Sequence, residues 1–327
     1  MAKTALSGRR VGKALAQVAI GYLDNADSAC HRLSDPQDSE ALHDFRVALR
    51  RLHSCLDAYP AIVSPVLSKR RLKRLRRLAK ATNAARDAEV QIQWLNEQSE
   101  LCLQPPVPAC ARLLTELQRR SCAGGGAPAQ SLPARFNRLQ RKLRKRLARL
   151  ADSTEGVEFG LSTARVALPL IRALRQGLSA ISGADDEAAA HAVRITAKRL
   201  RYLLTPLRAE YDACDRAVTA LGELQDLLGE LHDRHLFIPL LGQVAAAASA
   251  DRARRLFTLD SPVPGALAWA PAEAEGFVQL FQRNRAKAES LYDHLREHWL
   301  LDLPTFEAGL LAAVNALERG DVERRRR

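Results

Sequence analysis

The sequence is poor in aromatic residues: Phe, Trp and Tyr make up only 5% of its 327 residues, although 47% of the chain is hydrophobic. A core built from such a chain must rest on Leu, Ala and Val, and Leu and Ala favour helices. Strict alternation of apolar and polar residues, the signature of half-buried strands, is nearly absent. No segment approaches the roughly 18 consecutive apolar residues of a membrane span. These absences predict an all-α, soluble protein without a membrane-spanning segment.

The six cysteines lack the spacing of a zinc site or a redox pair, since no CxxC occurs among them. Most occupy apolar helical positions, where a free cysteine behaves as a small hydrophobe. The early apolar run ALAQVAIGYL is short and interrupted by Gln, and acidic DNAD follows it instead of a cleavage site. We therefore expect a reduced, cytoplasmic protein that holds no metal and no cofactor.

Acidic residues are scarce in the first half of the chain. Residues 1–150 contain 28 Lys and Arg against 12 Asp and Glu, whereas the remaining residues contain 22 against 25. The formal net charge is +13, so the excess of positive charge lies entirely in the first half. Such an excess attracts anionic partners.

Helical periodicity runs through most of the chain, interrupted by breakers rich in Pro, Gly and Ser such as SDPQDS, YPAIVSP and QPPVP. Helices are predicted at about 8–33, 37–59, 65–83, 86–103, 107–121, 133–152, 161–182, 186–209, 211–229, 231–248, 250–258, 272–299 and 304–319. The linker-like AGGGAPAQSLP is expected to join two helices within one half. One domain is expected over 8–319, with halves at about 8–152 and 161–319, followed by a basic tail at 320–327.

A basic motif occurs twice, 148 residues apart: HDFRVALRRLH at 43–53 and HAVRITAKRLR at 191–201. A second similarity follows each copy, because LRRLAKATNAARDAEV resembles VTALGELQDLLGELHDRH. This alignment places Asn83 opposite Gly229, and both residue types tolerate the left-handed conformation that ends a helix. Duplication of a helical unit explains these matches, and we expect two pseudo-symmetric four-helix bundles.

Four basic positions of each motif share an arc of about 80° on a helix that turns 100° per residue. We call these arcs the basic stripes: His43, Arg46, Arg50 and His53 in the first copy, and His191, Arg194, Lys198 and Arg201 in the second. Arg51 and Arg199 point elsewhere. Each stripe is about 15 Å long, which suits an extended polyanion better than a single phosphate. Protonation of His43 and His53 near the reference pKa of about 6.5 would strengthen binding between pH 7.5 and 6.

Two further segments combine a Leu face with a basic face. In KRRLKRLRRLAK and RFNRLQRKLRKRLARL, every third or fourth residue is apolar. The basic residues that we expect to converge with the stripes on one groove are Lys73, Arg76, Arg77, Lys80, Arg138, Arg141, Lys142 and Lys145.

The repeated motifs and the LGELQDLLGELHD segment resemble the two halves of a CHAD domain, the conserved histidine α-helical domain. The resemblance implies two four-helix bundles around a basic central pore that binds inorganic polyphosphate, and association with polyphosphate granules. His43, Arg46, Arg50, His191, Arg194, Lys198 and Arg201 would line that pore. Arg51, Arg86, Arg199 and His232 complete the expected set. His53 stands where an arginine is common in the family, and Asn83 replaces the usual glycine.

The resemblance implies binding without catalysis, because the ExExK motif of the triphosphatases fused to some relatives is missing. Two other functions compete with this interpretation. A nucleic-acid binder would use the same charge, but the stripes lack interleaved aromatic residues for base stacking. A metal-dependent phosphohydrolase would need carboxylates at matched positions, and the stripes carry none. A scaffold whose basic face docks an acidic protein is a third alternative.

Overall fold

The computed structural model describes residues 5–326 except 36, 39, 81, 82, 102–107, 126, 153–155 and 259–270. Side chains are described for the same residues except 83–87, 99–101, 122–125, 127–131, 272 and 321–326. Within these residues the chain is helical, and pairing of the β type is limited to one isolated bridge between Arg10 and Glu158. The predicted all-α class is confirmed.

The first half contains seven α-helices in the described residues: α1 (Val11–Arg32), α2 (Ala41–Asp57), α3 (Pro60–Val63), α4 (Lys69–Lys80), α5 (Asn83–Leu101), α6 (Pro108–Gly125) and α7 (Ala127–Ala151). The second half contains α8 (Phe159–Ser179), α9 (Glu187–Leu204), α10 (Asp212–Leu256), α11 (Pro271–Leu295) and α12 (Leu303–Arg326). A π-helical turn at Arg296–Leu300 joins α11 to α12.

Each half contains a group of four helices in which every helix contacts two neighbours. In the first half, α1 and α4 both contact α2 and α7; in the second, α8 and α10 both contact α9 and α12. The neighbours therefore follow the same order in the two halves, as a duplication would produce. The duplication itself stays a prediction.

The apolar periodicity of α2 explains its place in the core. Phe45, Leu49, Leu52 and Leu56 recur at helical spacing, and all four side chains are fully buried. Phe45 packs edge to face on Phe136 of α7, with ring centroids 5.1 Å apart. Burial of each such side chain contributes about 1.5–3 kcal/mol, so the Leu-rich faces predicted from the sequence hold this helix group together.

Contacts between the halves make them one body. The backbone N–H of Val11 donates to Val157 O at 3.0 Å, and that of Phe159 donates to Arg9 O at 2.8 Å. The buried hydroxyls of Tyr59 and Thr163 lie 2.7 Å apart. The main hydrophobic cluster contains side chains from both halves. Helices α1 and α8 also contact each other, as do α2 and α9.

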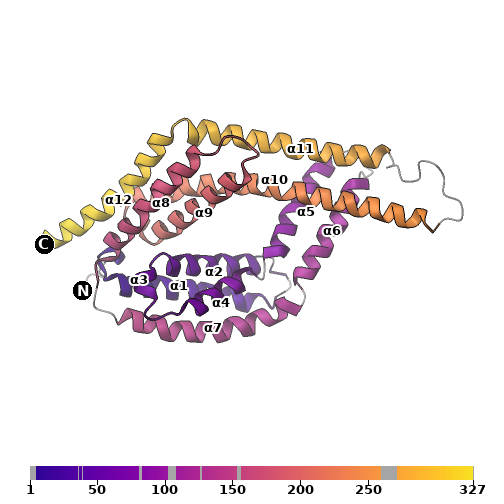
Figure 1. Cartoon of the computed structure of the whole chain (residues 1–327). Coiled ribbons are helices and arrows are strands. Elements are labelled where there is room, and N and C mark those ends of the chain that lie inside the picture. Colours follow the sequence, from indigo (N-terminus) through magenta and orange to yellow (C-terminus); the bar gives the residue numbers. More distant parts are fainter. Residues whose placement is uncertain are drawn as a thin grey trace.

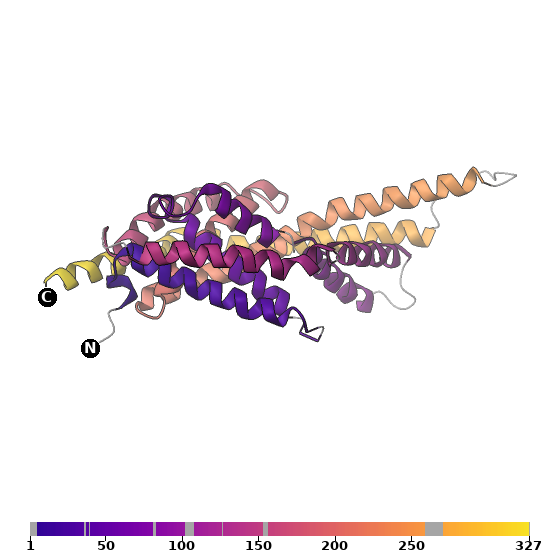
Figure 2. The ribbon, with the colours of Figure 1, turned by 90° about the horizontal axis from the view of Figure 1, so that it is seen from below.

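A second group of helices projects from this body. Figures 1 and 2 show α5, α6, the C-terminal part of α10 and the N-terminal part of α11 extending to one side, away from α1, α2, α7 and α12. These four helices share a smaller hydrophobic cluster. In it, Trp94 packs on Phe237 at 4.4 Å between centroids, and the Arg234 guanidinium lies 4.4 Å from the centre of the Trp94 ring. We call this group the distal arm. It mixes helices of both halves and was not predicted.

Helix α10 corrects the predicted boundaries. The sequence predicted three segments, at 211–229, 231–248 and 250–258, whereas the structure has one helix of 45 residues. Gly229 lies inside this helix and does not end it. Asn83 begins α5 instead of closing the helix before it. Among the described residues, only Gly156 has a positive φ.

None of the described helices is, on its own, both long and apolar enough to cross a bilayer. By length and composition alone, Glu273–Leu300 and Leu303–Gly320 reach that criterion as a pair, with a bend of 61° between them.

The contact between α8 and α9 depends on the absence of a side chain at Gly177. A Cβ atom at this position would lie 2.7 Å from a methyl group of Val193, a buried residue of α9. We expect Gly177→Ala to lower the free energy of unfolding by about 1–3 kcal/mol because of overpacking, despite the better helix propensity of Ala. Urea denaturation measures this change.

The matched control is Gly21→Ala in α1, where no atom lies within 4 Å of the new Cβ. This variant should be more stable than the wild type by up to about 1 kcal/mol. The double variant Gly177→Ala/Val193→Ala should recover part of the loss. Equal stabilisation by both single Ala variants would show that α8 and α9 are not packed this closely.

Candidate functional site

Arg50 of the first stripe and Lys198 of the second come together where α2 contacts α9. The charge of Arg50 on α2 acts on Lys198 of α9, together with that of Arg194. Burial, followed by these two guanidinium groups, lowers the pKa of Lys198 from 10.5 to about 8. No carboxylate is among the groups that shift this pKa. Like charges from both halves thus act on a half-buried Lys198, and no carboxylate offsets their effect on its pKa. We use the name α2–α9 cleft for this cluster of cations at the contact of the two helices.

Histidines of α9 and α10 lie beside these cations. The rings of His191 and His232 are 4.8 Å apart between centroids. Burial lowers the pKa of His232 to about 4, and the neighbouring Arg194, His191, His235 and Lys198 act in the same direction. His232 is therefore neutral at pH 7, and its ring can donate a hydrogen bond without adding charge.

His53, the last residue of the α2 stripe, lies near cations from two other helices. Burial lowers its pKa; Asp57 opposes this shift, while Arg76 of α4 and Arg199 of α9 add to it. In the free protein, the pKa of His53 is thus lower than the reference value on which the expected pH dependence of binding was based. Arg199, which the helical projection directed elsewhere, lies close enough to act on His53.

Two glycines of α10 make room for guanidinium groups of α9. A Cβ on Gly222 would lie 3.7 Å from Cζ of Arg201, and a Cβ on Gly229 would lie 3.8 Å from Nε of Arg194. A methyl group would fit at these distances, but a longer side chain would displace the arginine. The two glycines are seven residues apart, about two helical turns, like the two arginines. Gly229 is therefore explained by close packing and not by a helix end.

Several buried nitrogen atoms of this cleft have no hydrogen-bond partner among the described residues. They are Nε of Arg50, Nδ1 of His191 and Nδ1 of His232. A buried donor left without a partner costs about 1–3 kcal/mol. The cleft therefore contains polar groups that the fold alone leaves unsatisfied.

Other predicted residues lie away from the cleft. The positive charge of Arg51 acts on the pKa of Tyr22 in α1. Arg51 also lines a separate cavity of about 240 Å³ with Arg32 and Asp44. In this cavity, Asp44 forms an ion pair with Arg32 at 2.7 Å. An anion at Arg51 would therefore compete with a carboxylate.

The remaining predicted residues lie in a groove, on exposed surfaces, in a buried position or outside the described side chains. Arg77, Arg138 and Lys142 line a groove between α4 and α7. The residues exposed on the surface of α2, α4 and α7 are His43, Lys73, Lys80, Arg141 and Lys145. Arg46 is buried on α2, and the side chain of Arg86 lies outside the described residues. The structure thus places predicted residues at the α2–α9 cleft, in the groove between α4 and α7 and on exposed surfaces, and their convergence on one groove stays a prediction.

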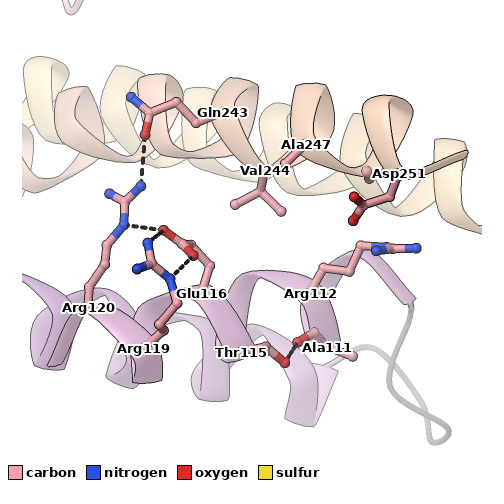
Figure 3. Close-up of a pocket in the computed structure, with 11 residues that line it drawn as sticks. Ala111, Arg112, Thr115, Glu116, Arg119, Arg120, Gln243, Val244, Ala247 and Asp251 are labelled. Atoms are coloured by element: carbon pink, nitrogen blue, oxygen red, sulfur yellow. Dashed lines mark hydrogen bonds and ion pairs between the residues drawn. The ribbon is translucent and has the colours of Figure 1, made fainter. Parts of the chain in front are cut away.

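A larger cleft, of about 590 Å³, lies between α6 and α10 in the distal arm (Figure 3). Its arginines have acidic or amide partners. Arg119 and Arg120 both donate to Glu116, at 2.8 and 2.7 Å, and Arg120 also reaches Gln243 at 2.8 Å. Arg112 pairs with Glu273 at 2.6 Å. These ion pairs neutralise the lining, which makes this cleft a poor site for a polyanion despite its size.

The part of the chain that the structure describes contains no group of three or more His, Cys, Asp or Glu side chains arranged to hold a metal ion.

Comparison with known proteins identifies the family. The model of the CHAD domain matches residues 17–242, which include both stripes and Gly229. The chain belongs to the CHAD domain family. A crystal structure of the CHAD domain from the plant Ricinus communis is similar over 95% of both chains, with a TM-score of 0.66 and 20% sequence identity. At this identity the likeness concerns the fold. No curated protein matches the chain.

Sequence reasoning missed four basic residues of this CHAD domain that lie beside the predicted ones. His235 acts on His232, and Arg71, Arg74 and Arg135 line the groove between α4 and α7. Arg74 and Arg135 each precede a predicted cation by three residues, and Arg71 precedes Arg74 by three, so the helical period carried a signal for them. No pattern in the sequence pointed to His235.

The shifted pKa of Lys198 predicts how this residue affects stability. The folded-state value, about 8, lies below the ordinary value of 10.5, so the charged Lys198 destabilises the fold at pH 7. As pH rises from 8 to 10.5, the folded chain releases this proton before the unfolded chain does, and the destabilisation disappears. We expect Lys198→Met to raise the free energy of unfolding at pH 7 by about 2 kcal/mol, and this advantage should shrink above pH 8.

Urea denaturation at low salt, between pH 6.5 and 10.5, measures this difference. Lys13→Met, at an exposed position of α1, is the control and should change stability little at every pH. A Lys198→Met protein that is less stable than the wild type at pH 7 would contradict the assigned electrostatic cost.

Proposed function

We propose that this CHAD domain binds inorganic polyphosphate in the α2–α9 cleft, without catalytic turnover. The observation that carries the proposal is the position of Lys198, which is partly buried between Arg50 and Arg194 with no acidic neighbour acting on its pKa. A bound polyanion would relieve the repulsion among these charges. Its oxygens would also accept a hydrogen bond from the buried Nε–H of Arg50, which the fold leaves without a partner.

The stripes favour an extended ligand over a single phosphate. Arg50 acts on Lys198, and Arg76 and Arg199 act on His53 one helical turn further along α2, so several cations follow one another at this contact. A linear phosphate chain carries its charge at regular intervals and can meet such a row. Arginine adds fork-shaped recognition of phosphate oxygens.

Binding without hydrolysis and a cytoplasmic location at polyphosphate granules complete the proposal. The cations of the cleft would hold a phosphate chain in place by electrostatic attraction. Phosphoryl transfer by a metal-dependent enzyme would further need carboxylates to hold Mg²⁺. Among the described residues, the one carboxylate that acts on the pKa of His53 is Asp57, which would supply a single metal ligand.

We expect long-chain polyphosphate to bind far more tightly than triphosphate or than single- and double-stranded DNA of equal charge. The affinity should fall steeply with salt, because each phosphate contact displaces counterions. The double variant Arg50→Gln/Lys198→Gln should lose about tenfold in affinity for each cation removed and should show a shallower salt dependence. Isothermal titration calorimetry between 50 and 300 mM salt measures both effects.

Arg165→Gln/Arg172→Gln is the matched control, since both arginines are exposed on α8 and the change in charge is the same. It should leave the affinity within about twofold of the wild type. Equal affinity for triphosphate and long chains would contradict an extended site. Release of phosphate from polyphosphate with Mg²⁺, if lost in the Arg50/Lys198 variant, would contradict binding without turnover.

A further inference from the structure

A groove of about 420 Å³ lies on the first-half helix group, between α4 and α7. It is lined by Arg71, Arg74 and Arg77 with Leu78 from α4, and by Arg135, Arg138 and Lys142 with Leu139 from α7. Six of these eight side chains are basic, and none is acidic. We call it the α4–α7 groove.

The helical period aligns these cations in two rows. On α4 they occur three residues apart, at 71, 74 and 77, and on α7 they lie at 135, 138 and 142. Each row is therefore about 9–11 Å long. Leu78 and Leu139 are buried, so the apolar contact that joins the helices also fixes the spacing between the rows.

The charge of this groove is not balanced within the described protein. The described residues give none of the six lining cations an ion pair, and the hydrogen bond recorded for Arg71 is a long one to Ser68 Oγ, at 3.4 Å. The distal cleft of Figure 3 is different, because its arginines pair with Glu116 and Glu273. A concave, cationic lining without counter-charges is suited to an anion that brings several charges at once.

We propose that the α4–α7 groove is a second binding site for linear phosphate chains, separate from the α2–α9 cleft. The inference extends the proposed function and rests on it for the identity of the ligand. Helix α4 connects the two places, since Arg76 acts on His53 in the cleft while Arg74 and Arg77 line the groove. A long chain can pass around α4 and occupy both sites, whereas a short chain occupies one at a time.

The lining favours a phosphate chain over a nucleic acid. Five of the six cations are arginines, whose planar fork donates two parallel hydrogen bonds to phosphate oxygens. No aromatic residue lines the groove, so it offers no surface on which a base could stack.

The test compares two variants for their binding of sodium tripolyphosphate and of long-chain polyphosphate. The groove variant combines Arg74→Gln, Arg77→Gln, Arg138→Gln and Lys142→Gln, all at exposed positions. The cleft variant combines Arg50→Gln and Lys198→Gln. Titration calorimetry at low salt should give two tripolyphosphate sites on the wild type and one on each variant. The groove variant should bind the long chain about a hundredfold more weakly, because bridging of two sites is lost.

The control removes the same charge elsewhere through Lys13→Gln, Arg165→Gln, Arg172→Gln and Arg216→Gln, at exposed positions of α1, α8 and α10. It should keep both tripolyphosphate sites, and circular dichroism should show unchanged helix content in every variant. A groove variant that retains wild-type stoichiometry and long-chain affinity would overturn the second site.

The two proposals fail in different ways. Loss of all tripolyphosphate binding in the cleft variant would remove the second site and leave the proposed function standing. Unchanged binding in the cleft variant, with one site lost in the groove variant, would contradict the cleft as the main site and support the groove.

Discussion

Repulsion between like charges at the contact of α2 and α9 is the constraint around which this CHAD domain is organised. Arg50 and Arg194 act there on Lys198, on which no carboxylate acts, and burial followed by these two positive charges lowers the pKa of Lys198 to about 8. Such an arrangement is unfavourable for folding by itself. It persists because the Leu-rich faces of the same helices are buried on their other sides, and this burial contributes far more free energy than the repulsion removes.

The fold holds these charges at fixed positions through contacts between the halves. The buried hydrogen bond between Tyr59 and Thr163 and the backbone bonds that connect Val11 with Val157 join the two helix groups. On the α10 side, Gly222 and Gly229 let the guanidinium groups of α9 lie close to the helix backbone. The cations are therefore arranged before any ligand arrives, which reduces the entropic cost of binding.

Periodicity predicted the helices and their core faces well, because burial of Leu and Phe at helical spacing is a local property. The same period predicted the stripes, of which the structure brings Arg50 and Lys198 together, and their role in binding stays a prediction. Periodicity divided α10 at Gly229, since a glycine that accommodates Arg194 has the same appearance in a sequence as one that ends a helix. The distal arm and the α4–α7 groove depend on which helices become neighbours, and no single helix carries that information. The family resemblance supplied the fold, which the comparisons confirm.

Proton uptake on binding tests the central claim most directly. At pH 8.5 most of the Lys198 side chains in the free protein are neutral, because their pKa is about 8. A phosphate chain in the α2–α9 cleft would favour the ammonium form of Lys198, so the protein should take up a fraction of a proton when the chain binds. The Lys198→Met variant should show no such uptake. Titration calorimetry of long-chain polyphosphate in buffers of different ionisation enthalpy measures this uptake. Binding without proton uptake at pH 8.5, or with the same uptake in Lys198→Met, would contradict the account.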